Sequence, residues 1–204
     1  LVPPMLFPFL KEQLGVGFIE LGFAITVFAV VSGLTQAPIG YLVDRVGARL
    51  ILLIGLVVGG LAFVLLAFHL SYANLIVCAA VLGLANSVYH PADYAILAAH
   101  MDETRMGRAF SIHTFAGFFG GAVAPAIVAG LLLAFGGRGA LLLIGAVGPL
   151  VALLLAAIRI PDAGAASSAP GAATSKVSMM TPAILLLTAF FLLLGLSNSG
   201  IGSF

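Results

Sequence analysis

Long apolar runs alternate with short polar segments along this chain. Five of the runs are long enough to cross a bilayer, which takes about 20 mostly apolar residues. They cover residues 18–40, 50–68, 75–98, 109–134 and 140–158. Residues 1–10 have the pattern of the end of an earlier run, and a further run starts at residue 179. The pattern predicts an all-α polytopic membrane protein with one partial helix, five complete spans and the start of a seventh.

The composition points to the same class of protein. Of the 204 residues, 62% are apolar and 7% are charged, whereas soluble globular proteins carry roughly 25% charged residues. A net charge of +1 provides no basic surface for phosphates, so we expect no nucleic-acid partner. The single cysteine, Cys78, lies inside an apolar run and predicts neither a disulfide nor a thiolate metal site.

A segment rich in Ala, Ser, Gly and Pro divides the chain into two parts. Residues 159–178 are too polar and too rich in Pro and Gly to cross lipid, so we predict a cytoplasmic interdomain linker. Residues 1–158 then form an N-terminal six-helix half whose first helix is truncated. Residues 179–204 begin a C-terminal half with helix seven. We interpret the sequence as a fragment of a longer protein.

Lys and Arg are distributed unequally between the two sides of the membrane. Successive loops alternate sides, and basic residues gather in cytoplasmic loops. One side carries Arg45, Arg49, Arg105, Arg108, Arg159 and Lys176, and the other carries Lys11 and Arg138. The first of these sides is therefore predicted to be cytoplasmic.

Two segments of the chain resemble each other at an offset of 90 residues. GYLVDRVGARLILLIG, residues 40–55, matches GLLLAFGGRGALLLIG, residues 130–145, at seven of sixteen positions. The matches include the glycine pairs Gly40/Gly130, Gly47/Gly137 and Gly55/Gly145. The two segments fall on opposite membrane sides, which indicates two inverted three-helix repeats, a plan used by many secondary transporters.

The first of these segments carries a recognisable signature. Its pattern G-x-L-x-D-R-x-G-x-R resembles the cytoplasmic motif of the major facilitator superfamily, whose members have two six-helix halves joined by a cytoplasmic linker. The resemblance implies that the segment is a conformational latch, which closes the cytoplasmic side when the transporter faces outward. The implied latch residues are Gly40, Asp44, Arg45, Gly47 and Arg49. Alternatively, the two arginines only enforce topology. An Asp contributes little to topology, so Asp44 favours the latch.

A second group of polar residues lies inside the third complete run, residues 75–98. Asn86, His90 and Asp93 are spaced to lie on one helix face. His113, on the next helix, is expected at a similar depth. Ionisable residues within a span are functional candidates by default, and histidine exchanges protons near neutral pH. These residues are therefore predicted to line a substrate or proton pathway, or else to lie at the cytoplasmic interface and bind helix ends or water.

Gln36 and Asn198 are further polar candidates for this pathway. A kinked or opened helix is expected at Pro91, because proline removes a backbone hydrogen bond. Small residues that let helices approach closely, together with a further proline, occur on the fifth span. The predicted packing and kink residues are Pro91, Gly117, Gly121 and Pro125. We expect no metal site.

The His-Pro pair at positions 90 and 91 also resembles transporters of the fosmidomycin-resistance type. This resemblance implies efflux of a drug or small organic compound. Two positions depart from common drug exporters. The arginine expected on helix four is Ala79, and the Gly-Pro pair of helix five is Ala124-Pro125. Any proton coupling therefore cannot use that arginine.

The function predicted from these features is secondary active transport of a small solute by alternating access. No phosphate-binding loop is present in the sequence, so we expect no ATP-driven transport and no cofactor. The expected source of energy is an ion gradient, with H⁺ as the default ion. Proton-coupled efflux is the first expectation and uptake of a metabolite or organic anion is the alternative. A membrane-embedded hydrolase is the rival class, but no GxSxG or HExxH motif supports an enzyme. We further expect a monomer at full length, in contact with membrane lipid in the bacterial inner membrane.

Overall fold

The computed structural model describes residues 6–158, 181, 182, 186 and 188–190. The chain divides into two compact units, Leu1–Ser167 and Ser168–Phe204. The helices that can be delimited all belong to the first unit. They are α1 (Phe7–Leu14), α2 (Phe18–Val46), α3 (Ala48–Phe68), α4 (Tyr72–His100) and α5 (Glu103–Ala157). The predicted linker at 159–178 and the site residue Asn198 lie outside the described residues.

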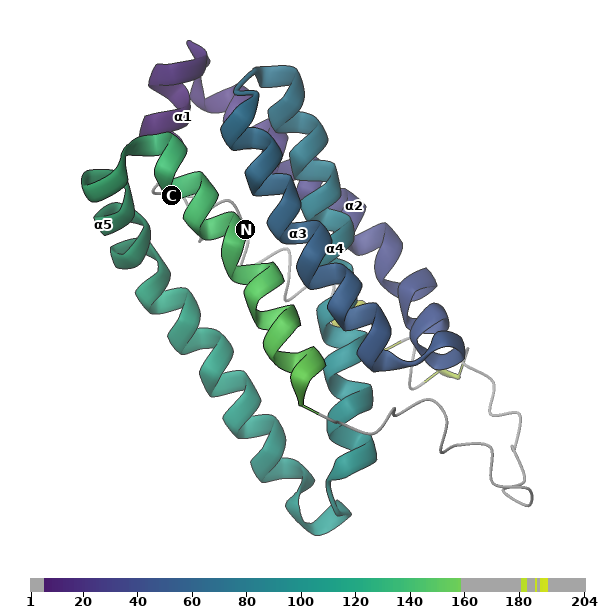
Figure 1. The fold of residues 1–204 in the computed structure, drawn as a ribbon. Helices are drawn as coiled ribbons and strands as arrows, with labels where there is room; N and C mark the ends of the chain where they lie inside the picture. The colour runs from purple at the N-terminus through teal and green to yellow at the C-terminus, as the bar shows by residue number, and fades with distance from the viewer. Residues whose placement is uncertain (1–5, 159–180, 183–185, 187, 191–204) are drawn as a thin grey trace. The chain divides into compact units, whose positions relative to one another are not determined.

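Helix α5 consists of two membrane spans. Its 55 residues would extend about 80 Å as a straight helix, more than twice the thickness of the hydrocarbon core. Gly136, with φ 66° and ψ 177°, breaks the helix, and Figure 1 shows the two limbs running antiparallel. The limbs correspond to the predicted spans 109–134 and 140–158. Together with α2, α3 and α4, which are also long and apolar enough to cross a membrane, the described part contains the five expected spans.

The helices of this unit approach one another through glycines. A Cβ atom on Gly60 of α3 would overlap Pro149 and the carbonyl oxygen of Gly145 on the second limb of α5. A Cβ atom on Gly83 of α4 would lie 2.5 Å from the carbonyl oxygen of Phe28 on α2. Without a hydrophobic drive between helices in lipid, such close backbone contact is a main source of stability.

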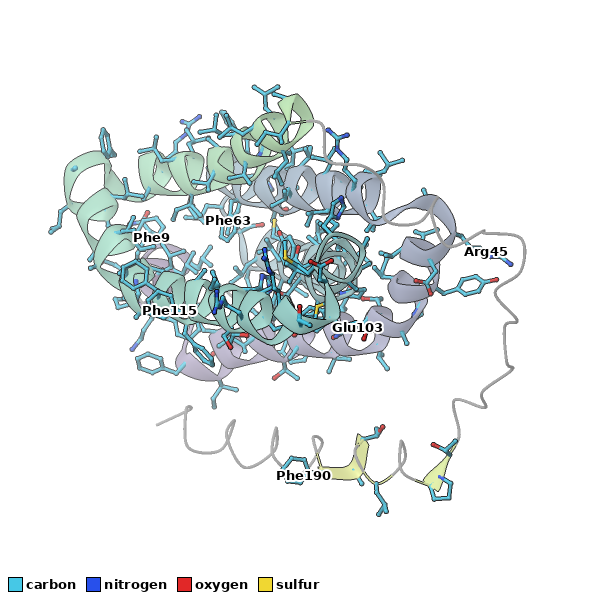
Figure 2. All side chains as sticks on the ribbon, turned by 90° about the horizontal axis from the view of Figure 1, so that it is seen from below. Phe9, Arg45, Phe63, Glu103, Phe115 and Phe190 are labelled. Atoms are coloured by element: carbon cyan, nitrogen blue, oxygen red, sulfur yellow. The ribbon has the colours of Figure 1, made fainter. Side chains whose placement is uncertain are left out.

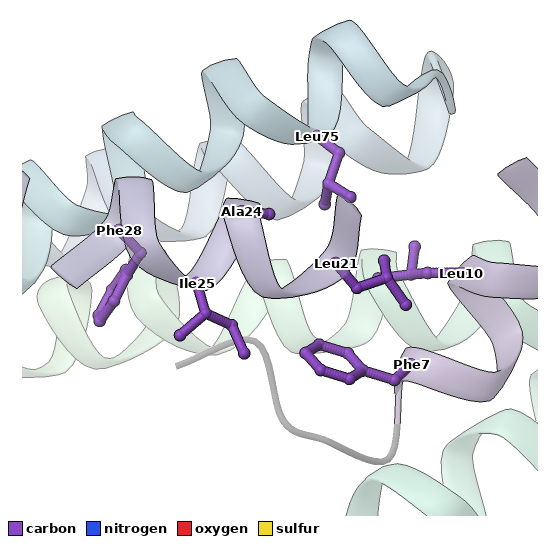
Figure 3. Close-up of a pocket in the computed structure, with 7 residues that line it drawn as sticks. All are labelled: Phe7, Leu10, Leu21, Ala24, Ile25, Phe28 and Leu75. Carbon is purple, nitrogen blue, oxygen red and sulfur yellow. The ribbon is translucent and has the colours of Figure 1, made fainter. Parts of the chain in front are cut away.

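Two apolar clusters fix the opposite ends of α2, α3 and α4. At one end, Leu10 of α1 is buried with Leu21 of α2 and Leu75 of α4. Figure 3 shows Phe7 and Leu10 directed toward α2, so the short α1 covers this end of the bundle. At the other end, Val43, Ala48, Ile51, Val88 and Ala92 form the second cluster.

Several boundaries differ from the prediction. Helix α2 continues to Val46, six residues beyond the end of the predicted span 18–40. Gly40 therefore lies inside the helix, and a Cβ atom on it would be 3.9 Å from Cβ of Pro91. Of the kinked or opened helix expected at Pro91, the opened form is not found, because α4 remains one continuous helix through that residue. Helices in membrane proteins tolerate proline where their neighbours satisfy the freed backbone groups.

Candidate functional site

A single residue joins α2 to α3. Gly47 has φ 108° and ψ 137°, a conformation that side chains with a Cβ rarely adopt. Its N–H still donates to the carbonyl of Val43 at 2.9 Å, so the helical hydrogen-bond pattern of α2 continues through its last turn. The turn places Asp44 and Arg45 at the end of α2 and Arg49 in the first turn of α3. The signature residues are therefore held by two helix ends instead of a loop.

Asp44 is exposed in the last turn of α2. Within the part of the chain that the structure describes, its carboxylate forms no hydrogen bond and no ion pair. A negative charge at a helix C-terminus opposes the helix dipole, at a cost of roughly 0.3–1 kcal/mol. Asp44 therefore does not stabilise the helix that carries it, and its carboxylate is available to a partner.

Arg45 interacts with an aromatic ring on its own helix. Its guanidinium carbon lies 4.4 Å from the centroid of the Tyr41 ring, one helical turn earlier. Figure 2 shows Arg45 at the edge of the bundle, directed away from the other helices. This cation–π contact orients the charge outward, as expected for a basic residue at the membrane surface.

Arg49 connects the turn to the far end of the sixth span. Its Nη2 atom donates to the carbonyl oxygens of Leu155, Ala156 and Ile158 at 3.2, 3.0 and 2.7 Å. The last carbonyls of a helix have no partner inside the helix, and a basic side chain there also complements the helix dipole. Arg49 therefore caps α5 within this half of the fold. Of the three charged signature residues, Asp44 is the one whose side chain forms no hydrogen bond, ion pair or ring contact with the described residues.

The second group of polar residues meets where α4 lies beside the first limb of α5. Asp93 Oδ2 is 3.8 Å from His113 Nε2, and both side chains are partly buried. The ring centroid of Tyr94 is 5.7 Å from that of His90 and 6.1 Å from that of His113. The expectation that His90 and His113 share a depth therefore agrees with the structure. The sequence analysis missed Tyr94, which its four-residue spacing from His90 could have indicated.

Asn86 has a structural contact in addition to its predicted place on the pathway. Its Nδ2 donates to Oγ of Ser32 at 2.9 Å, which joins α4 to α2 through a buried hydroxyl. Gln36, one turn further along α2, is exposed. The structure therefore does not gather Gln36 and Asn86 into one described site.

A cavity of about 490 Å³ lies between α2, α3, α4 and both limbs of α5. Its wall is mainly apolar, and Asn86 and Tyr89 are the polar side chains along it. No described atom lies within 4 Å of where a Cβ atom would stand on Gly117 or Gly121. Within the described region, close helix packing is therefore found at Gly60 and Gly83 and not at Gly117 or Gly121. Helix α5 continues through Pro125.

Comparison with known proteins gives one consistent result. The model of the Major Facilitator Superfamily matches residues 1–204. An Escherichia coli (strain K12) protein described as "Probable L-galactonate transporter" is 27% identical over 71% of this chain and 32% of its own length. The fosmidomycin resistance protein of the same strain is 29% identical over 64% of this chain and 32% of its own length.

A third relative comes from Cupriavidus necator. It is described as "Probable sulfoacetate transporter SauU" and is 31% identical over 69% of this chain and 33% of its own length. The chain thus spans about a third of the length of these curated relatives.

Proposed function

The chain belongs to the Major Facilitator Superfamily, and from that membership we propose that it is part of a secondary transporter that moves a small organic solute by alternating access. It is an integral multi-pass membrane protein, and its relatives are named as transporters, not as enzymes. In this plan the solute binds near the middle of the membrane, and the two halves alternately open to each side. The bacterial relatives favour the bacterial inner membrane as its location.

The observation that carries the proposal is the state of Asp44. Its carboxylate lies at a helix end on the side predicted to be cytoplasmic, opposes the local dipole, and has no described partner. A second half of the transporter would supply a partner only when the cytoplasmic side is closed. Asp44 then favours one of the two conformations, which is what a latch in an alternating-access cycle requires.

We further propose that the Asp93–His113 pair couples transport to protons. A carboxylate and an imidazole at 3.8 Å can share or exchange a proton, and histidine titrates near neutral pH. The pair connects α4 to the first limb of α5, so a change in its charge alters the attraction between two helices. In this scheme the pair takes the place of the helix-four arginine that drug exporters carry and this chain lacks at Ala79.

Two solute classes have support. Efflux of a small drug-like compound is favoured by the similarity to a fosmidomycin resistance protein. Transport of an organic acid is favoured by two other relatives, whose printed names refer to L-galactonate and sulfoacetate. Both of those compounds are anions at neutral pH. We place efflux first and uptake of an organic anion second.

The test uses the protein at its natural length in a drug-hypersensitive bacterial host. Susceptibility to a compound panel that includes fosmidomycin is compared for wild type, Asp44→Asn and His113→Gln at matched expression, with His69→Gln as the control histidine. Protection by wild type and control, with both site variants sensitive, supports proton-coupled efflux. If no compound is affected, uptake of labelled galactonate and sulfoacetate into proteoliposomes with an imposed pH gradient tests the second class. Failure of both assays with correctly inserted wild-type protein contradicts the proposed transport function.

A further inference from the structure

A pocket opens between the end of α4 and the first turns of α5. Its volume is about 650 Å³. Two arginines and a histidine supply its polar side chains, and aliphatic and thioether side chains supply the rest of its wall. The residues that carry the argument are Arg105, Arg108, Ile112 and His113 from α5, Leu97 from α4, and Met101, which directly follows α4. This pocket is separate from the central cavity, with which it shares no lining residue.

The spacing of these residues explains why they converge. Arg105, Arg108 and Ile112 follow one another at three and four positions, so they lie on one face of α5. Leu97 on α4 and Met101, four residues later and just past the end of α4, complete the opposite wall. Cations and an apolar surface that line the same pocket match a small molecule with a charged group and an organic body.

The charge in the pocket is not compensated locally. Among the described residues, neither Arg105 nor Arg108 forms an ion pair or a hydrogen bond. The acidic side chains of Asp102 and Glu103 precede these arginines on the chain and do not line the pocket. A guanidinium offers several N–H donors in a planar fork, which suits carboxylate, sulfonate and phosphate oxygens.

We propose that this pocket binds the anionic group of a small organic solute at the cytoplasmic mouth of the transport pathway. The assignment rests on the proposed transport function and specifies the solute as an organic anion. His113 lines the pocket and also faces Asp93 at 3.8 Å, so an anion held by the arginines is adjacent to the ionisable pair. Along α5, counted from its first residue, the two arginines precede His113, which faces Asp93.

The same chemistry could come from the headgroup of an anionic lipid, because the pocket is on the side where basic residues meet the membrane surface. Arg105 and Arg108 are exposed, so replacing them leaves the buried clusters intact. Arg138 provides a control, because Arg138→Gln removes an arginine charge just past Gly136, beyond the far end of α5's first limb.

The experiment measures ligand binding by calorimetry to the natural-length protein in nanodiscs of phosphatidylcholine. The probes are galactonate, sulfoacetate and a panel of other small carboxylates, sulfonates and phosphonates, with galactitol as a neutral analogue. We expect wild type and Arg138→Gln to bind an anion with the same affinity. The double variant Arg105→Gln/Arg108→Gln is expected to bind at least about tenfold more weakly, because it loses charge-assisted hydrogen bonds. The double Lys variant should lie between them.

Three results would overturn the assignment. One is an affinity that the double Gln variant leaves unchanged. The second is the absence of binding by every anion of the panel. The third is thermal stabilisation of wild type by added phosphatidylglycerol, lost in the double Gln variant, without binding of any soluble anion, which assigns the pocket to lipid. Proton-driven transport by wild type is assayed separately. If transport of a neutral solute is found, only the anion site fails; if no solute is transported, the proposed function fails.

Discussion

The two short turns of the bundle, at Gly47 and at Gly136, both reverse the chain at a glycine with positive φ, but they differ in the charged residues around them. In both, one glycine with positive φ reverses the chain between antiparallel spans, at φ 108° between α2 and α3 and at φ 66° within α5. The turn at Gly47 carries Asp44, Arg45 and Arg49 within six positions, whereas Arg138 is the one charged residue near Gly136. The backbone reversal therefore does not require the charges.

Arg138 shows what an isolated charge does at such a turn. Its guanidinium carbon lies 4.8 Å from the centroid of the Phe68 ring, at the end of α3, which is a modest stabilising contact. Arg49, in contrast, bonds to three carbonyls at the end of α5. The two turns therefore share the glycine reversal, and the cluster of three charges occurs at only one of them.

The largest expected effect separates Asp44 from Arg138. Asp44→Asn should leave membrane insertion intact and lower transport by at least about tenfold, which corresponds to the loss of one charge-assisted hydrogen bond in one conformation. Arg138→Gln should change transport less than twofold by the same reasoning, because it has no latch partner. Both variants are compared by solute flux at matched amounts of inserted protein. Normal flux through Asp44→Asn would contradict the latch.

A smaller effect, on stability, should be shared by the two turns. Gly47→Val and Gly136→Val force a β-branched residue into backbone conformations that it disfavours, at a cost of about 1–3 kcal/mol each. The measurement is the thermal midpoint of the protein in detergent, with Gly22→Val as a control, since Gly22 is helical and, apart from its own helix backbone, no described atom lies within 4 Å of its Cβ position. If only one turn is sensitive, the two reversals are not equivalent.

The smallest effect concerns the cap that only one turn possesses. Arg49→Gln should lower stability by about 1 kcal/mol, because it removes a cation from the C-terminus of α5. Arg49→Lys should restore part of this stability, since the charge remains while the forked donor is lost. Arg138→Gln, measured in the same way, should have little effect. A stability loss as large for Arg138→Gln as for Arg49→Gln would show that the capping geometry is unimportant.

The spans could be predicted from the sequence, and their ends could not. Apolar length is set by the thickness of the bilayer, so runs such as 50–68 and 75–98 give α3 and α4 nearly as found. Hydropathy does not predict where a helix ends once it has left the hydrocarbon core, because polar residues can also be helical. Residues 41–46 were therefore expected in a loop, although they complete α2.

The glycine alignment was also displaced by one position. It paired Gly47 with Gly137, but the residue with positive φ is Gly136. At Gly137 a Cβ atom would instead overlap the ring of Phe9, so that glycine is needed for packing. Consecutive glycines at 136 and 137 cannot be told apart without knowing which one faces a neighbour.

Of the candidate site, the approach of His113 to the His90 and Asp93 helix was predictable, because antiparallel neighbours joined by a short loop place residues equally far from the loop at similar depth. The cap made by Arg49 was not. Its partners are the backbone carbonyls of Leu155, Ala156 and Ile158, and carbonyls are the same for every residue type. No pattern of side chains marks them.

The glycine contact and the arginine cap act at two different heights along the same pair of helices. Gly60 meets Pro149 and Gly145 in the middle of α3, and Arg49 holds the end of α5 near Ile158. Contacts at two positions restrict both translation and rotation of one helix relative to the other. We therefore expect α3 and the second limb of α5 to move as one rigid body. The first limb, whose residues 114–122 are exposed, contacts α4 through the Asp93–His113 pair but has no such glycine contact or arginine cap in the described region. Tilting during a transport cycle would therefore be borne by the limb that carries His113 and the two pocket arginines.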